Sequence, residues 1–293
     1  MTQSEWLPLA QAHRSRADGF TAAHRERARR REPHPVWDFL FSYYSLRPRQ
    51  LRVFHPGYGT VLAGPAGRDY QSRTGYVAVA AGFTVSRDYL RTRRETVRFV
   101  AGLLRSTASR APRFGCFGMH EWAMVYRAGA VRHAGVPLRL GATGTDAVVE
   151  SMPLRCTHVD AYRFFTPAAA ARNEGTPTRT AQAEWEQPGC LHTNMDLYKW
   201  TYKLGPLVDS ALLMDCLELA AHARELDMRA SPYDLRGHGF SPIAVEEPAG
   251  RAEYVRRQSE IAERAARLRA TLLDRCENLL VDAGETAATS GRP

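Results

Sequence analysis

The chain has 293 residues, of which 44% are hydrophobic and 24% are charged, and its formal net charge is +9. This composition excludes wholesale disorder, and the length allows one large domain or two modest ones with a sizeable core. The basic side chains are almost all arginine, because Lys199 and Lys203 are the only lysines. A basic surface attracts nucleic acid, anionic lipid or acidic metabolites without selecting among them.

Neither a secretory leader nor a membrane span is expected. Residues 1–10 are mixed in character and followed by charge, and no apolar run approaches the ~20 residues that cross a bilayer. The five cysteines are odd in number and widely spaced, which is typical of a cytosolic protein without a disulfide framework. We therefore expect a soluble, cytoplasmic protein with no membrane partner, and the sequence names no protein partner.

Residues 1–32 are interpreted as a basic N-terminal arm. The dense arginine cluster at 25–31 is either a solvated helix face or a phosphate-binding tail. A single compact domain is expected over 33–282, and 283–293 has the composition of a disordered tail. The domain begins with a very aromatic segment, 37–46, which is expected to form a buried helix that stops before Pro48.

The next elements are two short strands and a long helix. Residues 58–62 and 76–83 are rich in β-branched and aromatic side chains between glycines, which favours strands. Ser86 is a good N-cap for an amphipathic helix over 87–104. Three arginines on the outer surface of this helix are candidates for DNA-phosphate contacts: Arg91, Arg94 and Arg98.

Further short strands are expected at 138–140, 147–150 and 154–158, followed by a loop over 166–183. From Thr193 onward the apolar spacing becomes helical, and the last long helix is expected over 251–281. The predicted fold class is therefore mainly α with a few short strands, an α+β arrangement in one compact domain.

Three short segments concentrate polar residues that are costly to bury unless they have a role. They span 114–122, 156–165 and 186–200. Each contains a histidine and a carboxylate, and these six are the candidate catalytic residues: His120, Glu121, His158, Asp160, His192 and Asp196.

Two kinds of enzyme site are consistent with these residues. In the first, the three histidines and a carboxylate from Asp160 or Asp196 bind a metal, with Cys156 or Cys190 as further ligands for zinc. In the second, a carboxylate holds or activates a water without a metal, and a histidine orients it. The remaining interpretation is that these residues are satisfied side chains of the core. Either enzyme site requires the three segments to meet in space.

Aromatic residues near these segments are candidates for the wall of a pocket for a flat ligand such as a nucleobase. The substrate-binding candidates are Trp122, Tyr126, Tyr162, Phe165, Tyr198 and Trp200. A fourth segment, 226–234, is either a substrate loop or a structural turn with an Asp–Arg pair. Asp227, Asp234 and Asp38 are also candidates for pairing with core arginines.

Five strings of the sequence resemble those of actinobacterial proteins commonly labelled 3-methyladenine DNA glycosylase. They are FGCFGMHEWAMVY (114–126), GTDAVVE (144–150), CTHVDAYRFFTP (156–167), EQPGCLHTNMDLYKW (186–200) and LDMRASPYDL (226–235). The resemblance extends over about 34–280. It implies excision of an alkylated purine from DNA, with the base flipped into an aromatic pocket and a carboxylate that stabilises the departing sugar or activates water.

We therefore expect a DNA glycosylase for alkylated purines that needs no cofactor and has DNA as its partner. Glu121 or Asp196 would be the acid–base or charge-stabilising group, and Trp122, Tyr162 and Trp200 would stack on the base. The alternatives are a metal-dependent enzyme acting on a small molecule, with His120 among its ligands, and a non-catalytic nucleic-acid-binding protein.

Overall fold

The computed structural model describes residues 1–129 and 135–284. The fold is mainly α-helical with a small antiparallel sheet, which confirms the predicted fold class. The helices are α1 (Gln3–Arg30), α2 (Phe39–Ser42), α3 (Pro48–Leu51), α4 (Arg87–Ala108), α5 (Met119–Ala123), α6 (Gly141–Ser151), α7 (Val159–Tyr162), α8 (Pro167–Ala170), α9 (Gln182–Trp185), α10 (Leu191–Leu204), α11 (Ser210–Arg229) and α12 (Pro248–Asp282), and the strands are β1 (Leu62–Ala63), β2 (Tyr76–Val79) and β3 (Gly82–Val85).

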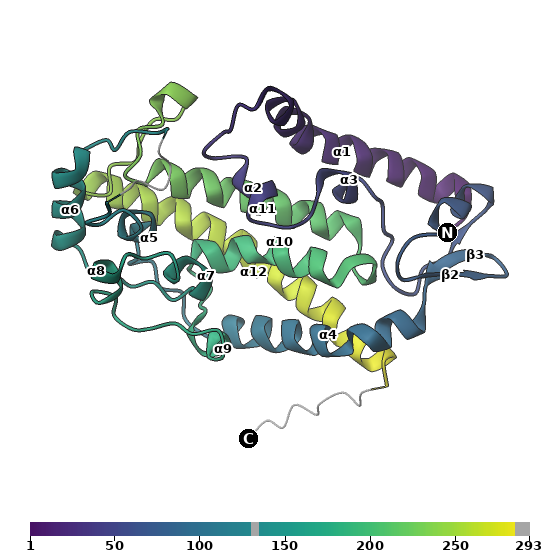
Figure 1. The fold of residues 1–293 in the computed structure, drawn as a ribbon. Coiled ribbons are helices and arrows are strands. Elements are labelled where there is room, and N and C mark those ends of the chain that lie inside the picture. The colour runs from purple at the N-terminus through teal and green to yellow at the C-terminus, as the bar shows by residue number, and fades with distance from the viewer. Residues whose placement is uncertain (130–134, 285–293) are drawn as a thin grey trace, which may run out of the picture.

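The long helices α4, α10, α11 and α12 form the body of the molecule. Helix α10 packs against α11, α12 and α4, and α12 also packs against α11 and α4 (Figure 1). The sheet and the N-terminus lie at one end of this body, while the short helices α5 to α8 gather at the other end. No helix in the described part of the chain is both long enough and apolar enough to cross a membrane.

Two of the long helices have apolar stripes that the sequence predicts, and one of them, α4, also has the predicted cap. Helix α4 begins after Ser86, whose Oγ accepts a hydrogen bond of 3.0 Å from the backbone N–H of Tyr89. Helix α12 buries Tyr254, Ile261 and Leu272 along one face, at the spacing of an amphipathic helix. The observed α12 exceeds the predicted helix by only a few residues at its N-terminal end.

The segment interpreted as an N-terminal arm contains helix α1, which packs against α11 and the sheet. Trp6, Ala10 and Ala17 are buried because they lie close together on one face of this helix. The indole N–H of Trp6 donates a hydrogen bond of 2.9 Å to the Ala63 carbonyl, which ties α1 to β1. Most of the predicted arm, Gln3–Arg30, is thus a helix packed on the rest of the fold. The disordered tail predicted over 283–293 lies almost entirely outside the described residues.

The sheet has the order β1-β3-β2, with Leu62 opposite Phe83 and Tyr76 opposite Val85. The predicted strand over 76–83 is therefore a hairpin, and of the one predicted over 58–62 only Leu62 lies in a strand. The predicted buried helix over 37–46 is reduced to the single turn of α2.

The later strand predictions are wrong. Residues 147–150 belong to α6, because Thr145, Val148 and Val149 are buried at helical spacing rather than in alternation. The predicted strands at 138–140 and 154–158 are each reduced to an isolated bridge, Leu138 with Tyr233 and Leu154 with Asn173. The predicted loop over 166–183 also contains the single turn of α8.

Candidate active site

A cavity of about 690 Å³ opens at the end of the helical body where the short helices gather. Residues of α2, α5, α7, α10 and α11 contribute to its wall. The ionisable lining residues include Asp38, Glu121, Asp160, His192 and Arg224, and the aromatic ones include Phe39, Tyr43 and Phe164. Two buried clusters of ionisable side chains meet at this wall.

The first cluster, called here the His120 group, combines residues of three helices. His120 and Glu121 come from α5, His192 from the first turn of α10, and Arg224 and Asp227 from α11. Gly118 begins α5 with a φ of 70°, a left-handed conformation that glycine adopts at little steric cost. All five side chains of the group are buried.

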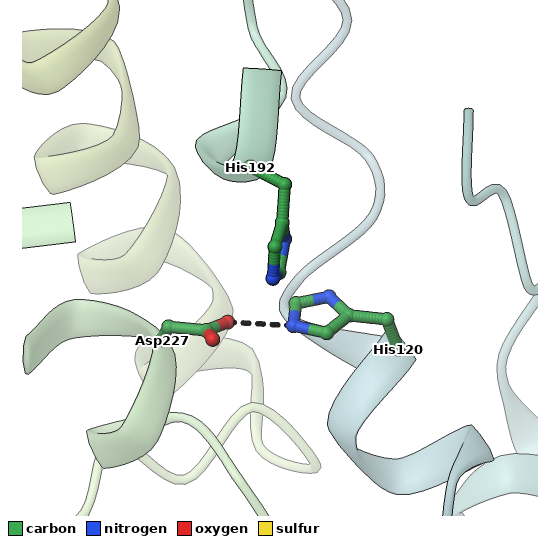
Figure 2. Close-up of side chains that lie close together, drawn as sticks. All are labelled: His120, His192 and Asp227. Carbon is green, nitrogen blue, oxygen red and sulfur yellow. Dashed lines mark ion pairs between the residues drawn. The ribbon is translucent and has the colours of Figure 1, made fainter. Parts of the chain in front are cut away.

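His120 and Asp227 form the ion pair at the centre of this group (Figure 2). The distance between His120 Nε2 and Asp227 Oδ1 is 2.8 Å. The ring of His192 points toward this pair, with its centroid 4.3 Å from that of His120 and the two ring planes 88° apart. Nitrogen and oxygen atoms of these three residues lie within 4.8 Å of one another, close enough to be considered as metal ligands.

Arg224 contributes a guanidinium group that contacts both carboxylates of the His120 group. Its Nη1 donates hydrogen bonds of 2.9 Å to Glu121 Oε1 and 3.1 Å to Asp227 Oδ2. The other carboxylate oxygens, Glu121 Oε2 and Asp227 Oδ1, are buried and have no hydrogen-bond partner among the described residues, and the same is true of His120 Nε2. His120 and Asp227 are therefore adjacent without the alignment of a hydrogen bond.

Burial and neighbouring charges move the pKa values of this group in different directions. Burial, reinforced by His120, places the pKa of His192 well below its usual range, so this ring is neutral. Burial alone would lower the pKa of His120, but the attraction of Asp227 outweighs it and raises that pKa. Burial opposes ionisation of Asp227, yet His120 holds its pKa below the usual range.

The second cluster, called here the His158 group, lies beside the first. It consists of His158, Asp160, Glu186, Asp196 and Lys199, all of them buried. The ring centroids of His158 and His192 are 5.4 Å apart, so the two groups are adjacent. The structure therefore brings together the three segments that sequence analysis singled out.

The Lys199 ammonium lies between two carboxylates of the His158 group. Its Nζ donates to Asp160 Oδ2 at 3.2 Å and also contacts Asp196 Oδ2. His158 Nε2 lies 3.1 Å from the same Asp196 oxygen, and the Tyr44 hydroxyl donates to Asp196 Oδ1 at 3.2 Å. This group therefore contains its own cation, and both oxygens of Asp196 have partners.

The pKa values of the His158 group reflect this pairing. Burial would raise the pKa of Asp196, but Lys199 and then His158 hold it far below the usual range. Burial likewise opposes ionisation of Asp160, and Lys199 again lowers its pKa. Burial raises the pKa of Glu186, which lies farther from the ammonium than the two aspartates do.

The six candidate carboxylates and histidines do not share one role in the structure. Glu121, Asp160 and His192 line the cavity, whereas His120, His158 and Asp196 are buried and do not line it. Asp160 lies in α7, directly after the segment 154–158 that was expected to be a strand.

The aromatic candidates lie away from the cavity. Among the residues that the structure describes, none of the six lines its wall. The Trp122 indole donates to the Ala230 carbonyl at 2.8 Å in the core, and the Tyr126 hydroxyl donates to Glu150 at 2.9 Å. Tyr198 is fully buried, Trp200 packs under Lys199, and Tyr162 contacts Phe165. Trp122, Tyr126, Tyr198 and Trp200 pack in the core, Tyr162 and Phe165 are half-buried, and the aromatic part of the cavity wall is formed by Phe39, Tyr43 and Phe164.

Arg91, Arg94 and Arg98 are exposed along α4, as expected, and each has a nearby acidic side chain. Arg91 pairs with Asp88 at 3.0 Å, and Arg98 and Arg94 both lie near Glu95. Described residues of α4 line a separate groove of about 520 Å³ rather than the cavity. Asp160 and Lys199 lie on the wall of that groove as well.

Sequence reasoning missed the two cations that organise these groups. Lys199 follows Asp196 by three residues in α10, and Arg224 precedes Asp227 by three residues in α11. A basic residue three positions from an acidic one in a strongly apolar helix is a signal for a buried ion pair. Of the three aspartates considered as partners of core arginines, only Asp227 contacts a buried one, Arg224. Asp38 pairs with the half-buried Arg27, and Asp234 pairs with the exposed Arg236.

No protein-family model, curated protein or solved structure matches this chain.

Proposed function

We propose that the cavity is the active site of a hydrolase that cleaves the N-glycosidic bond of an alkylated purine in DNA. The observation that carries this proposal is the position of Glu121. Its Oε1 is fixed by Arg224, its Oε2 has no partner among the described residues, and the side chain lies on the cavity wall. A fixed carboxylate with one unpartnered oxygen is suited to bind a water or to stabilise positive charge on a sugar.

The other walls of the cavity support a flat substrate. Phe39 and Tyr43 are stacked with ring centroids 4.7 Å apart and planes 8° apart. Phe164 lies on the same wall, and the cavity volume of about 690 Å³ is within the range of small-ligand sites. A base rotated out of a DNA duplex would find both aromatic faces and polar groups here, which is how base-excising enzymes select their target.

The reaction proposed for this site is hydrolysis of the N-glycosidic bond. The bond between the sugar C1′ and the purine nitrogen breaks, and its electron pair leaves with the base, which neutralises the positive charge that the alkyl group had introduced. The oxygen of a water forms a bond to C1′ and loses a proton to Glu121. Asp160 keeps its negative charge near the developing cation, since its pKa is held low by Lys199 against the effect of burial.

The test is release of methylated purine from alkylated duplex DNA. We expect Glu121→Gln to reduce the rate at least ~100-fold, the lower end of typical acid–base contributions, while the glutamine oxygen keeps the bond to Arg224. Glu260→Gln, at an exposed carboxylate paired with Arg256, is the matched control and should retain full activity. Wild-type protein that releases no methylated purine, or equal rates for the two variants, would contradict the proposal.

DNA binding is tested separately from catalysis. The net charge of +9 and the exposed arginines of α4 support affinity for a polyanion, which should fall steeply with salt concentration because bound counterions are released. Salt-sensitive binding without any base release would favour the non-catalytic nucleic-acid-binding alternative. Loss of both would leave a small-molecule substrate as the alternative.

A further inference from the structure

The two buried groups differ in how many cations accompany their carboxylates. In the His158 group, Lys199 lies between Asp160 and Asp196, and Arg179 also contacts Asp160. In the His120 group, the single guanidinium of Arg224 is shared by Glu121 and Asp227. Apart from the contact with His120, the two carboxylates of the His120 group therefore have a single cationic partner, whereas the two aspartates of the His158 group have two.

Two atoms of the His120 group that are of the kind that binds metal ions make an ion-pair contact but no hydrogen bond with a described residue. His120 Nε2 and Asp227 Oδ1 lie 2.8 Å apart, but neither makes a hydrogen bond with a described residue. The ring of His192 makes ring contacts with His120 and His158, and it shares the 4.8 Å cluster with His120 and Asp227. Figure 2 shows that His120 and His192 direct ring nitrogens, and Asp227 a carboxylate oxygen, toward a common region.

We propose that His120, His192 and Asp227 bind a divalent metal ion of the zinc type at the wall of the cavity. Two imidazole nitrogens and one carboxylate oxygen are a common ligand set for catalytic zinc, which leaves a further position for water or substrate. His192 lies on the cavity wall, so this position is reached from the cavity. Arg224 holds the second oxygen of Asp227, which fixes the carboxylate as outer partners of metal ligands do.

The fit requires only a small closure of the three side chains. Ligand atoms around zinc lie ~2.1 Å from the ion, so two of them are at most ~4.2 Å apart. The three atoms of this group lie within 4.8 Å of one another, and a shift of roughly half an ångström in the side chains brings them within that limit. The other cluster with metal-like spacing, His158 with Asp160 and Asp196, has Lys199 in contact with both aspartates, so an ion there would have to displace a buried ammonium.

This site replaces the metal set that sequence alone suggests. That set includes His158 with a carboxylate from Asp160 or Asp196. In the structure, His158 contacts Asp196 in the group that contains Lys199. Asp227 takes its place, although it lies 107 residues beyond His120 in the sequence. The inference is independent of the N-glycosidic reaction, because it concerns binding of the ion and not the bond that is cleaved.

The experiment uses the full chain, purified without a histidine tag or a nickel column, treated with chelator and then titrated with Zn²⁺. We expect about one zinc per chain, the number for a single three-ligand site, and a rise in Tm because the ion binds only the folded state. Asp227→Asn and His120→Gln should each lower the zinc affinity at least ~10-fold. His158→Gln is the matched control, since it alters a buried histidine beside a carboxylate and should leave zinc binding unchanged.

Each outcome has a definite meaning. Wild-type protein that binds no zinc overturns the site. Zinc that both Asp227→Asn and His120→Gln retain, or that His158→Gln loses, also overturns it. Zinc binding without release of methylated purine supports the metal site and rejects the glycosylase. Base release by zinc-free protein supports the glycosylase and separates its activity from the ion.

Discussion

The His120 group and the His158 group contain similar residues but differ in the hydrogen bonding of their carboxylates. Each has one or more histidines, at least two carboxylates and one buried cation, and their nearest rings are 5.4 Å apart. In the His158 group, Asp196 makes bonds through both oxygens, to Tyr44 on one side and to Lys199 and His158 on the other. In the His120 group, Glu121 and Asp227 each have one oxygen without a hydrogen bond to a described residue.

The two groups thus differ in their carboxylates, although each also has a buried histidine nitrogen without a hydrogen-bond partner among the described residues, Nδ1 of His158 and Nε2 of His120. A buried polar network stabilises a unique core only when its members are satisfied, and unsatisfied atoms are expensive. Atoms left without partners in a native protein call for an explanation such as a ligand or catalysis. We therefore expect Glu121 and Asp227 to have a chemical role, and Asp196 and Lys199 to have a structural one.

The largest predicted effect is that of removing the Lys199 ammonium from the His158 group. Lys199→Met removes the ammonium and leaves Asp160 and Asp196 buried side by side. We expect the free energy of unfolding to fall by about 3–5 kcal/mol, the range for removing one partner of a buried ion pair. Urea denaturation measures this loss.

Lys203→Met is the matched control for Lys199→Met. Lys203 lies one turn further along α10 and also contacts the Trp200 ring, at 5.6 Å, but it is exposed. Its substitution should change stability by no more than about 0.5 kcal/mol, as is usual for surface positions. Equal effects of the two substitutions would show that Lys199 is not the centre of a structural network.

A smaller effect is predicted for two neighbouring buried tyrosines. Tyr44 donates to Asp196, whereas the hydroxyl of Tyr198 has no partner among the described residues, and the two rings are 5.3 Å apart. Tyr44→Phe removes a hydrogen bond to a charged group and should cost about 1.5–3 kcal/mol. Tyr198→Phe should be neutral or stabilising, because it removes a buried hydroxyl that makes no bond.

The tyrosine pair is measured by thermal or urea unfolding of the two single variants. The two substitutions delete the same atom from the same residue type, so differences in cavity size and transfer free energy cancel. If Tyr198→Phe proves as destabilising as Tyr44→Phe, the hydrogen bond to Asp196 contributes nothing specific, and the contrast between satisfied and unsatisfied atoms in this core fails.

The long helices could be predicted from the sequence because their signals extend over many residues. The Ser86 cap and the stripe from Tyr254 to Leu279 are both local, repeated patterns. The strand prediction over 147–150 was wrong because a run of four residues is consistent with the periodicity of either a strand or a helix. In the structure, Thr145 and Val148 are buried three residues apart, as in a helix. Short segments are settled by packing, which the local sequence does not contain.

The sequence predicted which segments form the site but not which of their side chains contact one another. The segments with His120, His158 and His192 meet, as a shared site requires. Which carboxylate lies beside which histidine depends on α11, which is far from α5 in sequence. It also depends on Lys199 and Arg224, two buried cations that the apolar periodicity of their helices does not predict. The aromatic wall could not be predicted, because core packing and a ligand cavity require the same residue types.

The smallest predicted effect concerns Glu186, at the edge of the His158 group. Its Oε1 accepts a hydrogen bond of 2.5 Å from Gln182 and lies 3.7 Å from His158 Nε2, and burial raises its pKa above the usual 4.5. Folding therefore favours the protonated carboxyl. That contribution to stability is complete below pH 4.5 and is lost as the pH rises through the folded-state pKa.

Glu186→Gln should therefore make the protein more stable than the wild type at neutral pH, with the advantage shrinking as the pH falls toward 4.5. Glutamine keeps an oxygen for Gln182 and carries no charge, so the variant isolates the cost of ionisation. Glu184→Gln, at an exposed position of α9, which ends directly before Glu186, should show no such pH-dependent advantage. Urea unfolding of all three proteins from pH 4 to pH 8 measures the difference. A Glu186→Gln variant that is less stable than the wild type at pH 7 would mean that Lys199 and His158 hold three carboxylates in ionised form, and the His158 group would then be larger than the two aspartates around Lys199.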